Sequence, residues 1–434
     1  MRLNVAFSYN RLWKLTREIG INKTKLRDES GITSSSLARL SQNKNVRLEV
    51  LERLCNYLDC RIEDIVEYVP ERKKMNNQDK LKFVDLFAGI GGFRLAGEEN
   101  GMECVFSSEI DKFACDVYKE NFGETPEGDI TKIEESKIPD FDVLFAGFPC
   151  QPFSYAGQLQ GFEDEIRGTL FFDIIRILKE KKPKMFLLEN VKGIKSHDKG
   201  KTFNTILEHL NQLDYHIHWT ILNSLDFGVP QSRERWYCVG FKKDVEFEFP
   251  NPINSKSTLR EIIDWHENDN LTLKLSDFEM NRINHHFMIC NYDSPEQVRV
   301  EHDNSKYNPN TKKGKYGVFS YLKPDKSLRF HVGDFAKTQI QEAYYCNLDS
   351  FSPSIIAARA PKLWDIGRHL SVRECARLQG FPEDFRLSSS QVQAKKQLGN
   401  SVTVPVISEI VKNMLVAYKL NKTPSEQLLL SEVR

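Results

Sequence analysis

The tetrapeptide Phe148-Pro149-Cys150-Gln151 contains the side chain of this protein best suited to covalent chemistry. It follows a short apolar run, Val143 to Ala146, that is typical of a buried strand, and it begins a loop with a second proline, Pro152. A cysteine in such a loop is accessible, and the prolines limit its motion, which suits a nucleophile. The alternative is a buried structural cysteine, the usual situation of a lone one.

Two further segments carry an acid and two cations. The apolar run Met185 to Leu188 ends in Glu189, and two arginines, Arg233 and Arg235, precede the strand-like run Trp236 to Phe241. Side chains alternate along an extended segment, so Gln231 shares one face with both arginines. Arginines near a cysteine favour the thiolate, and a glutamate screened from water can hold a proton. These residue types suit addition of a thiolate to an electron-poor ring, followed by group transfer.

A glycine turn predicts a pocket for an adenosine ligand. The strand-like run Lys82 to Phe87 is followed by the turn Ala88-Gly89-Ile90-Gly91-Gly92. The next predicted strand, Met102 to Ser108, ends in Glu109, an acid placed to accept hydrogen bonds from ribose hydroxyls. We expect a third strand end at Gly128-Asp129-Ile130, with Asp129 at the adenine. The pattern differs from the dinucleotide motif G-x-G-x-x-G, and the alternative is an ordinary tight turn.

The elements that must position these residues indicate an α/β protein. Strand-like and helical runs alternate from Leu81 to about Phe241, which predicts βαβ units and a mostly parallel, Rossmann-like sheet. Successive strand ends of such a sheet meet at one edge, so we expect Asp85, Glu109, Cys150 and Glu189 around one crevice. Helical patterns return at 371–379 and 402–420.

Residues 242–367 lose this alternation and predict a second, irregular domain inserted into the first. Basic and aromatic residues are interleaved there, as contact with DNA would require. The alternative is a solvated loop face. The residues concerned are Lys312, Lys313, Lys315, Tyr316, Phe319, Tyr321 and Lys323.

Residues 1–70 predict a separate all-α domain. A helix at 23–29, a turn at Gly31 and a helix at 34–40 form a helix-turn-helix pattern, with Leu26, Ile32 and Leu37 packed inside. The pattern resembles the DNA-binding domains of phage repressors, and the exposed polar residues Ser34, Ser35, Ser36 and Arg39 then face the major groove. The alternative is a helical dimerisation or docking module. The polar segment 71–80 is expected to be a linker.

Composition sets further limits. The 434 residues contain 61 Lys and Arg and 61 Asp and Glu, so the net charge says nothing about a polyanionic partner. Residues 1–80 carry 16 basic against 11 acidic residues, a weak indication of nucleic-acid contact. Nine cysteines without a C-x-x-C pair indicate a reducing compartment and no structural metal. No apolar run suits a membrane span or a signal peptide, so we expect a cytoplasmic protein without a membrane partner.

The full motif series resembles that of the cytosine-5 DNA methyltransferases. The resemblance covers residues 81–241 and 368–420, in the order of the family. The segments are DLFAGIGGF (85–93), SSEID (107–111), GDI (128–130), GFPCQPFS (147–154), RGTLFFDI (167–174), ENV (189–191), QSRER (231–235), RHLSVRECARLQGFP (368–382) and QLGNSVTVPV (397–406). The segments PCQ, ENV and QxRxR together are very specific to this family.

The resemblance implies a mechanism. The target cytosine is flipped out of duplex DNA, Cys150 attacks its carbon 6, and Glu189 protonates nitrogen 3. Arg233 and Arg235 hold the base, and S-adenosyl-L-methionine supplies the methyl group. Gln231 is expected at the DNA. The implied cofactor residues are Phe87, Gly89, Gly91, Glu109, Asp129, Pro149, Asn400 and Ser401. Ile110 stands where many relatives have an aromatic residue, which bears on cofactor affinity and not on the chemistry.

The implied organisation is a catalytic domain at 81–241, a target-recognition domain at 242–367 and a C-terminal part of the catalytic domain at 368–434. The leading hypothesis is an enzyme that methylates a short DNA sequence beside a cognate restriction enzyme, with an N-terminal domain that binds a promoter. The alternatives are a protein that is mainly a transcription regulator, and a cytosine-5 methyltransferase of transfer RNA. We expect the catalytic domain to act as a monomer, and a dimer, if one forms, to use the N-terminal domain.

Overall fold

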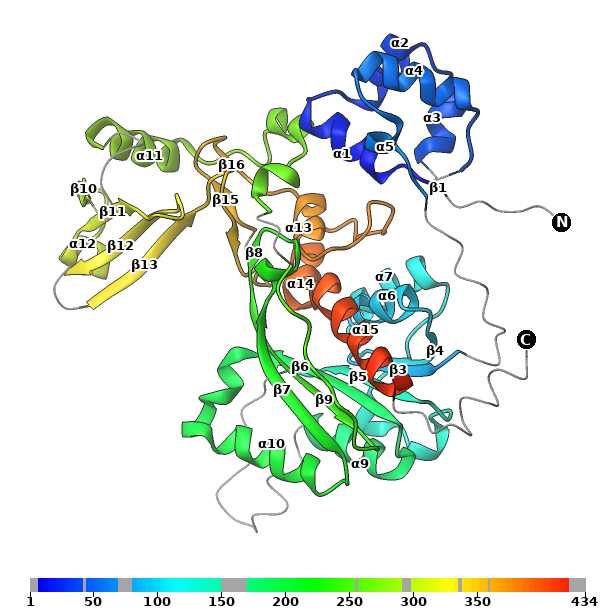
Figure 1. Ribbon diagram of the computed structural model, residues 1–434. Helices are drawn as coiled ribbons and strands as arrows, with labels where there is room; N and C mark the ends of the chain where they lie inside the picture. Colours follow the sequence, from blue (N-terminus) through cyan, green and yellow to red (C-terminus); the bar gives the residue numbers. More distant parts are fainter. Residues whose placement is uncertain are drawn as a thin grey trace. The chain divides into compact units, whose positions relative to one another are not determined.

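The computed structural model describes residues 7–41, 44–68, 80–149, 170–253, 257–290, 298–334, 338–357 and 360–420. The chain divides into two compact units (Figure 1). The N-terminal unit comprises Met1–Lys80 and Arg260–Thr272, and the main unit comprises Leu81–Leu259 and Leu273–Arg434. Of the predicted linker 71–80, only Lys80 lies within the described residues. The predicted nucleophile Cys150 lies outside them.

The N-terminal unit is helical, as its apolar spacing predicts. Its elements are β1 (Phe7–Ser8), α1 (Asn10–Glu18), α2 (Lys23–Ser30), α3 (Ser34–Ser41), α4 (Leu48–Leu58), α5 (Ile62–Ile65) and β2 (Glu67–Tyr68). Leu26 and Ile32 are buried in its core, and Leu37 packs against that core, as expected. Gly31 ends α2 at a φ of 67°, a conformation that glycine adopts without steric cost, so the chain turns directly into α3.

The main unit is built on a six-stranded sheet in the order β4-β3-β5-β6-β9-β7. The strands are β3 (Lys82–Leu86), β4 (Glu103–Ser108), β5 (Val143–Gly147), β6 (Met185–Val191), β7 (His216–Asn223) and β9 (Glu234–Phe241). Strand β9 runs antiparallel to its neighbours β6 and β7, and the other pairs are parallel. The mostly parallel, Rossmann-like sheet is therefore confirmed.

Helices between the strands cover this sheet. They are α6 (Gly92–Glu99), α7 (Lys112–Phe122), α9 (Leu170–Lys181) and α10 (Lys201–Asn211), and three C-terminal helices follow: α13 (Val372–Leu378), α14 (Gln391–Asn400) and α15 (Val404–Leu420). Helix α15 packs against α6, where the Asn100 side-chain amide donates to the hydroxyl of Ser408 over 3.0 Å. The C-terminal segment thus lies beside the helix that follows the first strand of the sheet. Within the described residues, no helix has the length and hydropathy to span a bilayer.

The region predicted to be irregular contains regular structure, so that expectation was wrong. It forms an antiparallel sheet of β10 (Val300–His302), β11 (Val318–Leu322), β12 (Leu328–Asp334) and β13 (Thr338–Tyr345), with α11 (Asp277–Ile289) and the short α12 (Lys312–Tyr316). Figure 1 shows this sheet as a separate ribbon layer. Short strands separated by polar loops give weak periodicity, which explains the error. Phe319, expected at the DNA, is only 1% exposed.

Candidate active site

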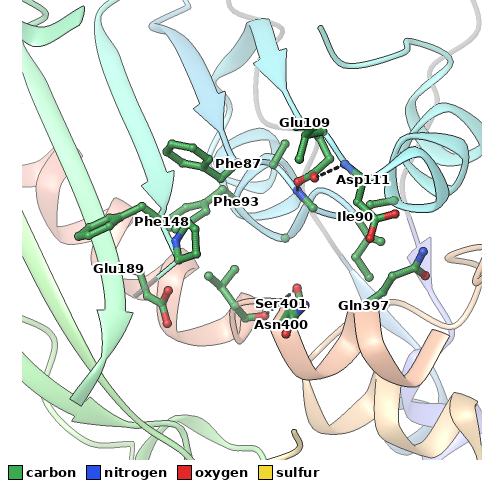
Figure 2. A pocket seen from close by; sticks show the side chains of 18 of the residues that line it. Phe87, Ile90, Phe93, Glu109, Asp111, Phe148, Glu189, Gln397, Asn400 and Ser401 are labelled. Carbon is green, nitrogen blue, oxygen red and sulfur yellow. Dashed lines mark hydrogen bonds between the residues drawn. The ribbon is translucent and has the colours of Figure 1, made fainter. Parts of the chain in front are cut away.

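A cavity of about 790 Å³ lies at the carboxyl ends of β3, β4, β5 and β6. This is the edge where open α/β sheets bind ligands. Helix α14 and the turn after it form the opposite wall (Figure 2). The predicted site residues that line the cavity are Phe87, Gly89, Glu109, Asp129, Pro149, Glu189, Arg233, Arg235, Asn400 and Ser401. The structure thus brings together residues from seven separate sequence motifs.

Gly91 is the predicted cofactor residue that does not line this cavity. It precedes α6 with a φ of 93°, and an added Cβ would lie 2.3 Å from the ring of Phe122. The turn therefore needs glycine at this position for its backbone conformation and for packing. A contact between Gly91 and the cofactor therefore stays a prediction.

Glu109 fastens the glycine turn to the end of β4. One carboxylate oxygen accepts the backbone N–H of Gly89 at 2.8 Å, and the other accepts that of Asp111 at 2.7 Å. Figure 2 shows both bonds at the upper rim of the cavity. Each carboxylate oxygen can accept a further hydrogen bond, so Glu109 can hold the turn and still contact a ligand.

Asp129 lines the cavity, but it does not end a strand as predicted. It caps the 3₁₀ helix Ile130–Lys132, and one of its oxygens accepts from the Thr131 backbone at 3.1 Å and hydroxyl at 2.7 Å. These bonds and nearby Lys132 lower the pKa of Asp129. The prediction failed because Glu127 pairs with Ser108 through an isolated bridge and no strand continues from it.

Glu189 lies within β6, beside Gly147 of β5 and Tyr237 of β9. It is 8% exposed, and one of its oxygens is 3.2 Å from Nε of Arg235. Burial raises the pKa of Glu189 above its ordinary value, and the charges of Arg235 and Arg233 oppose this shift. The site therefore combines a carboxyl that holds a proton more readily than usual with a cation directly beside it.

Arg233 and Arg235 differ, although the alternation of the chain places them on one face. Arg233 is 3% exposed, and its terminal nitrogens donate to four oxygens of the protein. These are Ser354 Oγ at 3.1 Å, Ile355 O at 3.0 Å, Gly399 O at 3.1 Å and Ser401 O at 2.7 Å. Burial lowers the pKa of Arg233 to about 10. Arg233 thus joins two distant backbone segments, and Arg235 pairs with the acid.

Gln231 is fully buried, and the expectation that it contacts DNA was wrong. Strand β8 (Gln231–Ser232) pairs with β14 (Ser352–Pro353), which covers the side chain. The side-chain amide donates to the Leu378 carbonyl at 2.9 Å and accepts from the Ile355 N–H at 2.8 Å. Gln231 therefore connects three backbone segments inside the protein.

Two residues missed by sequence reasoning stand out. Asn190, 2% exposed, donates to the carbonyl of Phe148 at 3.0 Å and accepts from the N–H of Val191 at 2.8 Å. The sequence feature that could have identified Asn190 is a polar residue at the end of an apolar strand, directly after Glu189. Gln397 lines the cavity from α14, and neither its side-chain oxygen nor its nitrogen has a partner among the described residues.

In the N-terminal unit, helix α3 carries the predicted DNA contacts. Ser34, Ser35 and Arg39 are exposed. Ser36 is half-buried, and its hydroxyl lies 3.0 Å from that of Thr33, which accepts the Ser36 backbone N–H at 3.1 Å and so caps the helix. Nε of Arg39 donates to the Asn45 carbonyl at 2.8 Å. The exposed residues Ser34, Ser35 and Arg39 thus give the outer face of α3 a polar surface.

Comparison with known proteins gives two family matches. The family model for C-5 cytosine-specific DNA methylases matches residues 81–416, and that for the Cro/C1-type HTH DNA-binding domain matches residues 11–71. Type II methyltransferase M1.ScrFI of Lactococcus lactis subsp. cremoris is 42% identical over 351 residues, which cover 79% of this chain and 80% of that protein. Type II methyltransferase M.HhaI of Haemophilus parahaemolyticus is 40% identical over 346 residues, covering 77% and 94%.

Solved structures agree in fold. The Dnmt2 methyltransferase of S. pombe superposes with a TM-score of 0.55 at 19% identity, over 79% of this chain and 100% of that one. A putative DNA modification methyltransferase encoded within an E. coli prophage gives a TM-score of 0.53 at 21% identity, over 78% and 100%. At these identities the likeness concerns the fold alone.

Proposed function

Since this chain belongs to the C-5 cytosine-specific DNA methylase family and is a DNA cytosine-5 methyltransferase, we propose that it transfers a methyl group from S-adenosyl-L-methionine to carbon 5 of a cytosine flipped out of a short duplex sequence. The observation that carries the proposal is the pair of buried Glu189 and half-buried Arg235, in a cavity that also includes Pro149, the residue before Cys150. The related enzymes are Type II methyltransferases, which favours duplex DNA over transfer RNA as the acceptor.

The residues around the cavity fit the proposed cofactor. Phe87 offers an aromatic face for adenine, Glu109 offers carboxylate oxygens for ribose hydroxyls, and Asn400 and Ser401 offer polar groups from the opposite wall. Ser108, Arg233 and Gln397 line the cavity, and each has a buried polar atom without a hydrogen-bond partner among the described residues. When bound, the cofactor supplies an electrophilic methyl group.

The protein must make carbon 5 of cytosine nucleophilic. In our proposal the Cys150 thiolate forms a bond to carbon 6 while Glu189 delivers its proton to nitrogen 3, so the ring becomes an enamine with electron density on carbon 5. Once carbon 5 carries the methyl group, a base removes the carbon 5 proton, the electrons of that bond form the carbon 5–carbon 6 double bond and expel the thiolate, and nitrogen 3 returns its proton to Glu189. Burial raises the pKa of Glu189, which favours the protonated form that the proposed step requires.

The supporting residues have distinct proposed tasks. Asn190 holds the carbonyl of Phe148, two residues before Cys150, and so orients the start of the nucleophile's loop. Arg235 supports Glu189 and the charge that develops on the base. Arg233 acts as a positioning residue, because its bonds to Ile355 and Gly399 hold the two segments that border the base and the cofactor.

The experiment is bisulfite sequencing of DNA from cells that express this chain or its Cys150→Ala variant. We expect cytosines of one short motif to be protected only with the unsubstituted protein. Full protection by Cys150→Ala would refute the covalent mechanism. If soluble unsubstituted protein protects no cytosine, methyl transfer to duplex DNA and to transfer RNA should be compared directly, and transfer to RNA alone would refute the proposed acceptor.

The N-terminal unit supports a second role. Because α3 presents Ser34, Ser35 and Arg39 and belongs to a Cro/C1-type domain, we propose that it binds a promoter and regulates transcription of a cytoplasmic restriction-modification system with a cognate endonuclease. Deletion of residues 1–70 should abolish promoter binding and leave methyl transfer measurable. Repression that persists without these residues would refute the regulatory role.

A further inference from the structure

A basic segment follows β6, the strand that carries Glu189. Residues 192–201, which we call the lysine segment, contain four lysines and a single acid, Asp198. The residue before this segment, Val191, lines the cavity and is 40% exposed, so it lies at the cavity mouth. The lysine segment therefore starts beside the proposed active site. Its lysines are all exposed, and they are Lys192, Lys195, Lys199 and Lys201.

Internal contacts hold the lysine segment against the main unit. The Ile194 side chain is buried in the core beneath the sheet, and Nδ1 of His197 lies 2.7 Å from the hydroxyl of Thr202. A Cβ added to Gly200 would lie 3.7 Å from the carbonyl oxygen of Lys195, so the later residues of the segment lie close to the earlier ones. Charges on a segment held in this way lose less conformational freedom when they bind a partner.

Neighbouring acids balance only part of this positive charge. Lys192 pairs with Glu234, with Nζ and Oε1 2.9 Å apart. Lys199 and Lys201 form no ion pair with any residue that the structure describes. Four lysines against Asp198 and Glu234 leave a surplus of two positive charges at the surface. A surplus of this kind beside a ligand cavity attracts a polyanion.

Two adjacent residues of the lysine segment adopt a left-handed backbone. Asp198 has a φ of 46°, and Lys199 has a φ of 53°. This conformation is uncommon for residues other than glycine and unfavourable for lysine, because its Cβ comes too close to the following carbonyl oxygen. Unfavourable backbone conformations are concentrated at functional sites. The strained turn is therefore a second indication, independent of the charge, that this surface binds a partner.

We propose that the lysine segment binds the phosphate backbone of duplex DNA next to the flipped cytosine, with Lys199 and Lys201 as two of its contacts. This inference rests on the proposed function and deepens it, because it assigns the surface that holds the DNA backbone. A base inside the cavity stays attached to its own sugar and phosphates, so these phosphates lie at the cavity mouth. Lysine suits this task, since its ammonium group is a compact charge with three donors and requires no fixed partner geometry.

The experiment measures methyl transfer by the full chain to a duplex that carries the motif found by bisulfite sequencing. Methyl transfer reports DNA bound at the catalytic site, so DNA held by the N-terminal unit does not produce the signal. We expect the double variant Lys199→Gln/Lys201→Gln to raise KM for the duplex about 10- to 50-fold at 0.1 M salt and to keep kcat within about twofold. The slope of log KM against log salt concentration should fall by about 2, because two phosphate contacts are lost.

The matched control is Lys179→Gln, at an exposed lysine of α9 without an ion pair in the described part of the chain. Leu170 at the start of α9 lines the cavity, and Lys179 lies about two and a half turns further along the helix, away from the cavity. This variant should leave KM and its salt dependence unchanged.

Two single variants separate charge from backbone strain. Asp198→Asn removes the only acid of the lysine segment and should lower KM about two- to fivefold. Lys199→Gly removes a charge and the strain together, because glycine adopts a left-handed backbone without steric cost. It should therefore unfold at a higher temperature than the unsubstituted chain and still have a raised KM. A residue that serves only the stability of the turn would not combine these two changes.

Each result bears on the inference separately from the proposed function. If the double variant matches Lys179→Gln in KM and salt dependence, or loses kcat at an unchanged KM, the inference is overturned and the proposed function stands. If the double variant also unfolds at a lower temperature, Lys199→Gly decides, and an unchanged KM in that variant overturns the inference. If the unsubstituted chain methylates no duplex, the proposed acceptor is wrong and the inference fails with it. A raised KM with a reduced salt dependence supports both.

Discussion

The cavity and the antiparallel sheet of the main unit differ in how many of their buried polar groups have hydrogen-bond partners. Ser108, Arg233 and Gln397 line the cavity and each keep a buried polar atom without a partner in the described part of the chain. We call the described residues of 273–367 the recognition region. Among the atoms described there, only Nδ1 of His331 is a buried side-chain polar atom without a hydrogen-bond partner. Three residues outside both regions, Asp85, Trp236 and Gln393, also have such atoms within the described part of the chain.

Polar groups in the recognition region satisfy one another. Glu342 pairs with Arg282 at 2.9 Å and with Lys313 at 2.6 Å. The hydroxyl of Ser320 lies 2.7 Å from Nδ1 of His286 and 2.7 Å from Nε2 of His302. Buried polar groups that pair with one another help to specify a unique structure. Substitutions should therefore affect catalysis in the first region and folding in the second.

The largest effect is expected at Glu189. Glu189→Gln removes the proton that we assign to nitrogen 3 of cytosine, so kcat should fall about 10³-fold while DNA binding is kept. Single-turnover methyl transfer and a DNA-binding titration measure the two quantities. Glu234→Gln, at an exposed acid of β9 paired with Lys192, is the matched control and should retain activity. Comparable rates for Glu189→Gln and this control would remove Glu189 from the mechanism.

Asn190→Leu should have the next largest effect. Loss of its bond to the Phe148 carbonyl loosens the start of the nucleophile's loop, and we expect kcat to fall about 10²-fold, as misplacement of a reacting group by about 1 Å does. Affinity for S-adenosylhomocysteine should stay within about twofold. If cofactor affinity falls as much as kcat, Asn190 supports the whole cavity and not the loop in particular.

Glu342→Gln tests the recognition region. It leaves Arg282 and Lys313 without their shared carboxylate, and we expect the free energy of unfolding to fall by about 2 kcal/mol, less than for a fully buried pair because solvent reaches part of the network. Fluorescence of Trp364, which packs on Phe287 with ring centroids 4.5 Å apart, should report the transition. Cofactor affinity should not change. A loss of cofactor binding without a loss of stability would contradict the division of roles.

The smallest effect is a pH dependence of the same region. The Ser320 hydroxyl has one proton, so it can donate to only one of the two ring nitrogens, and the histidine that accepts this proton must be neutral. Burial lowers the pKa of His286 to about 4 and that of His302 to about 3, with Arg282 and His285 adding to the shift at His302.

These lowered pKa values make the recognition region less stable as the pH falls. Below about pH 6.5 the unfolded histidines take up protons and the folded ones do not, so the region loses stability as pH falls toward 4 and gains none above 7. Between pH 7 and pH 6 the loss should be about 1 kcal/mol for the two histidines together. Urea unfolding at several pH values, followed by Trp364 fluorescence, measures it. A His286→Gln variant with an unchanged pH profile would show that His286 does not contribute.

Sequence reasoning was accurate where the signal is local. The helices expected at 23–29 and 34–40 are α2 and α3, extended by one residue each, because apolar spacing and Gly31 determine them within a few turns of chain. The strand expected at Met185–Leu188 continues to Val191, since the polar residues Glu189 and Asn190 still pair with β9. A polar residue ends an apolar pattern in the sequence but need not end a strand.

Contacts between distant residues were out of reach. The antiparallel sheet was missed because its strands are short and carry buried polar residues such as His302 and Ser320, which obscure the alternation. Gln231 and Arg233 look like surface or substrate residues in sequence. They are buried because residues 352–355 and 399–401, more than a hundred positions away, cover them.

The amino-acid sequence by itself determined the helix-turn-helix pattern, the parallel sheet and the ordered motifs that converge at its edge. These depend on local spacing and on the rule that parallel strands end on one side. Only the tertiary structure decided which of two similar arginines meets Glu189, and that Gln231 is enclosed by backbone segments distant in the chain. A polar side chain has its role set by the partners around it, and those partners come from segments that only folding brings together.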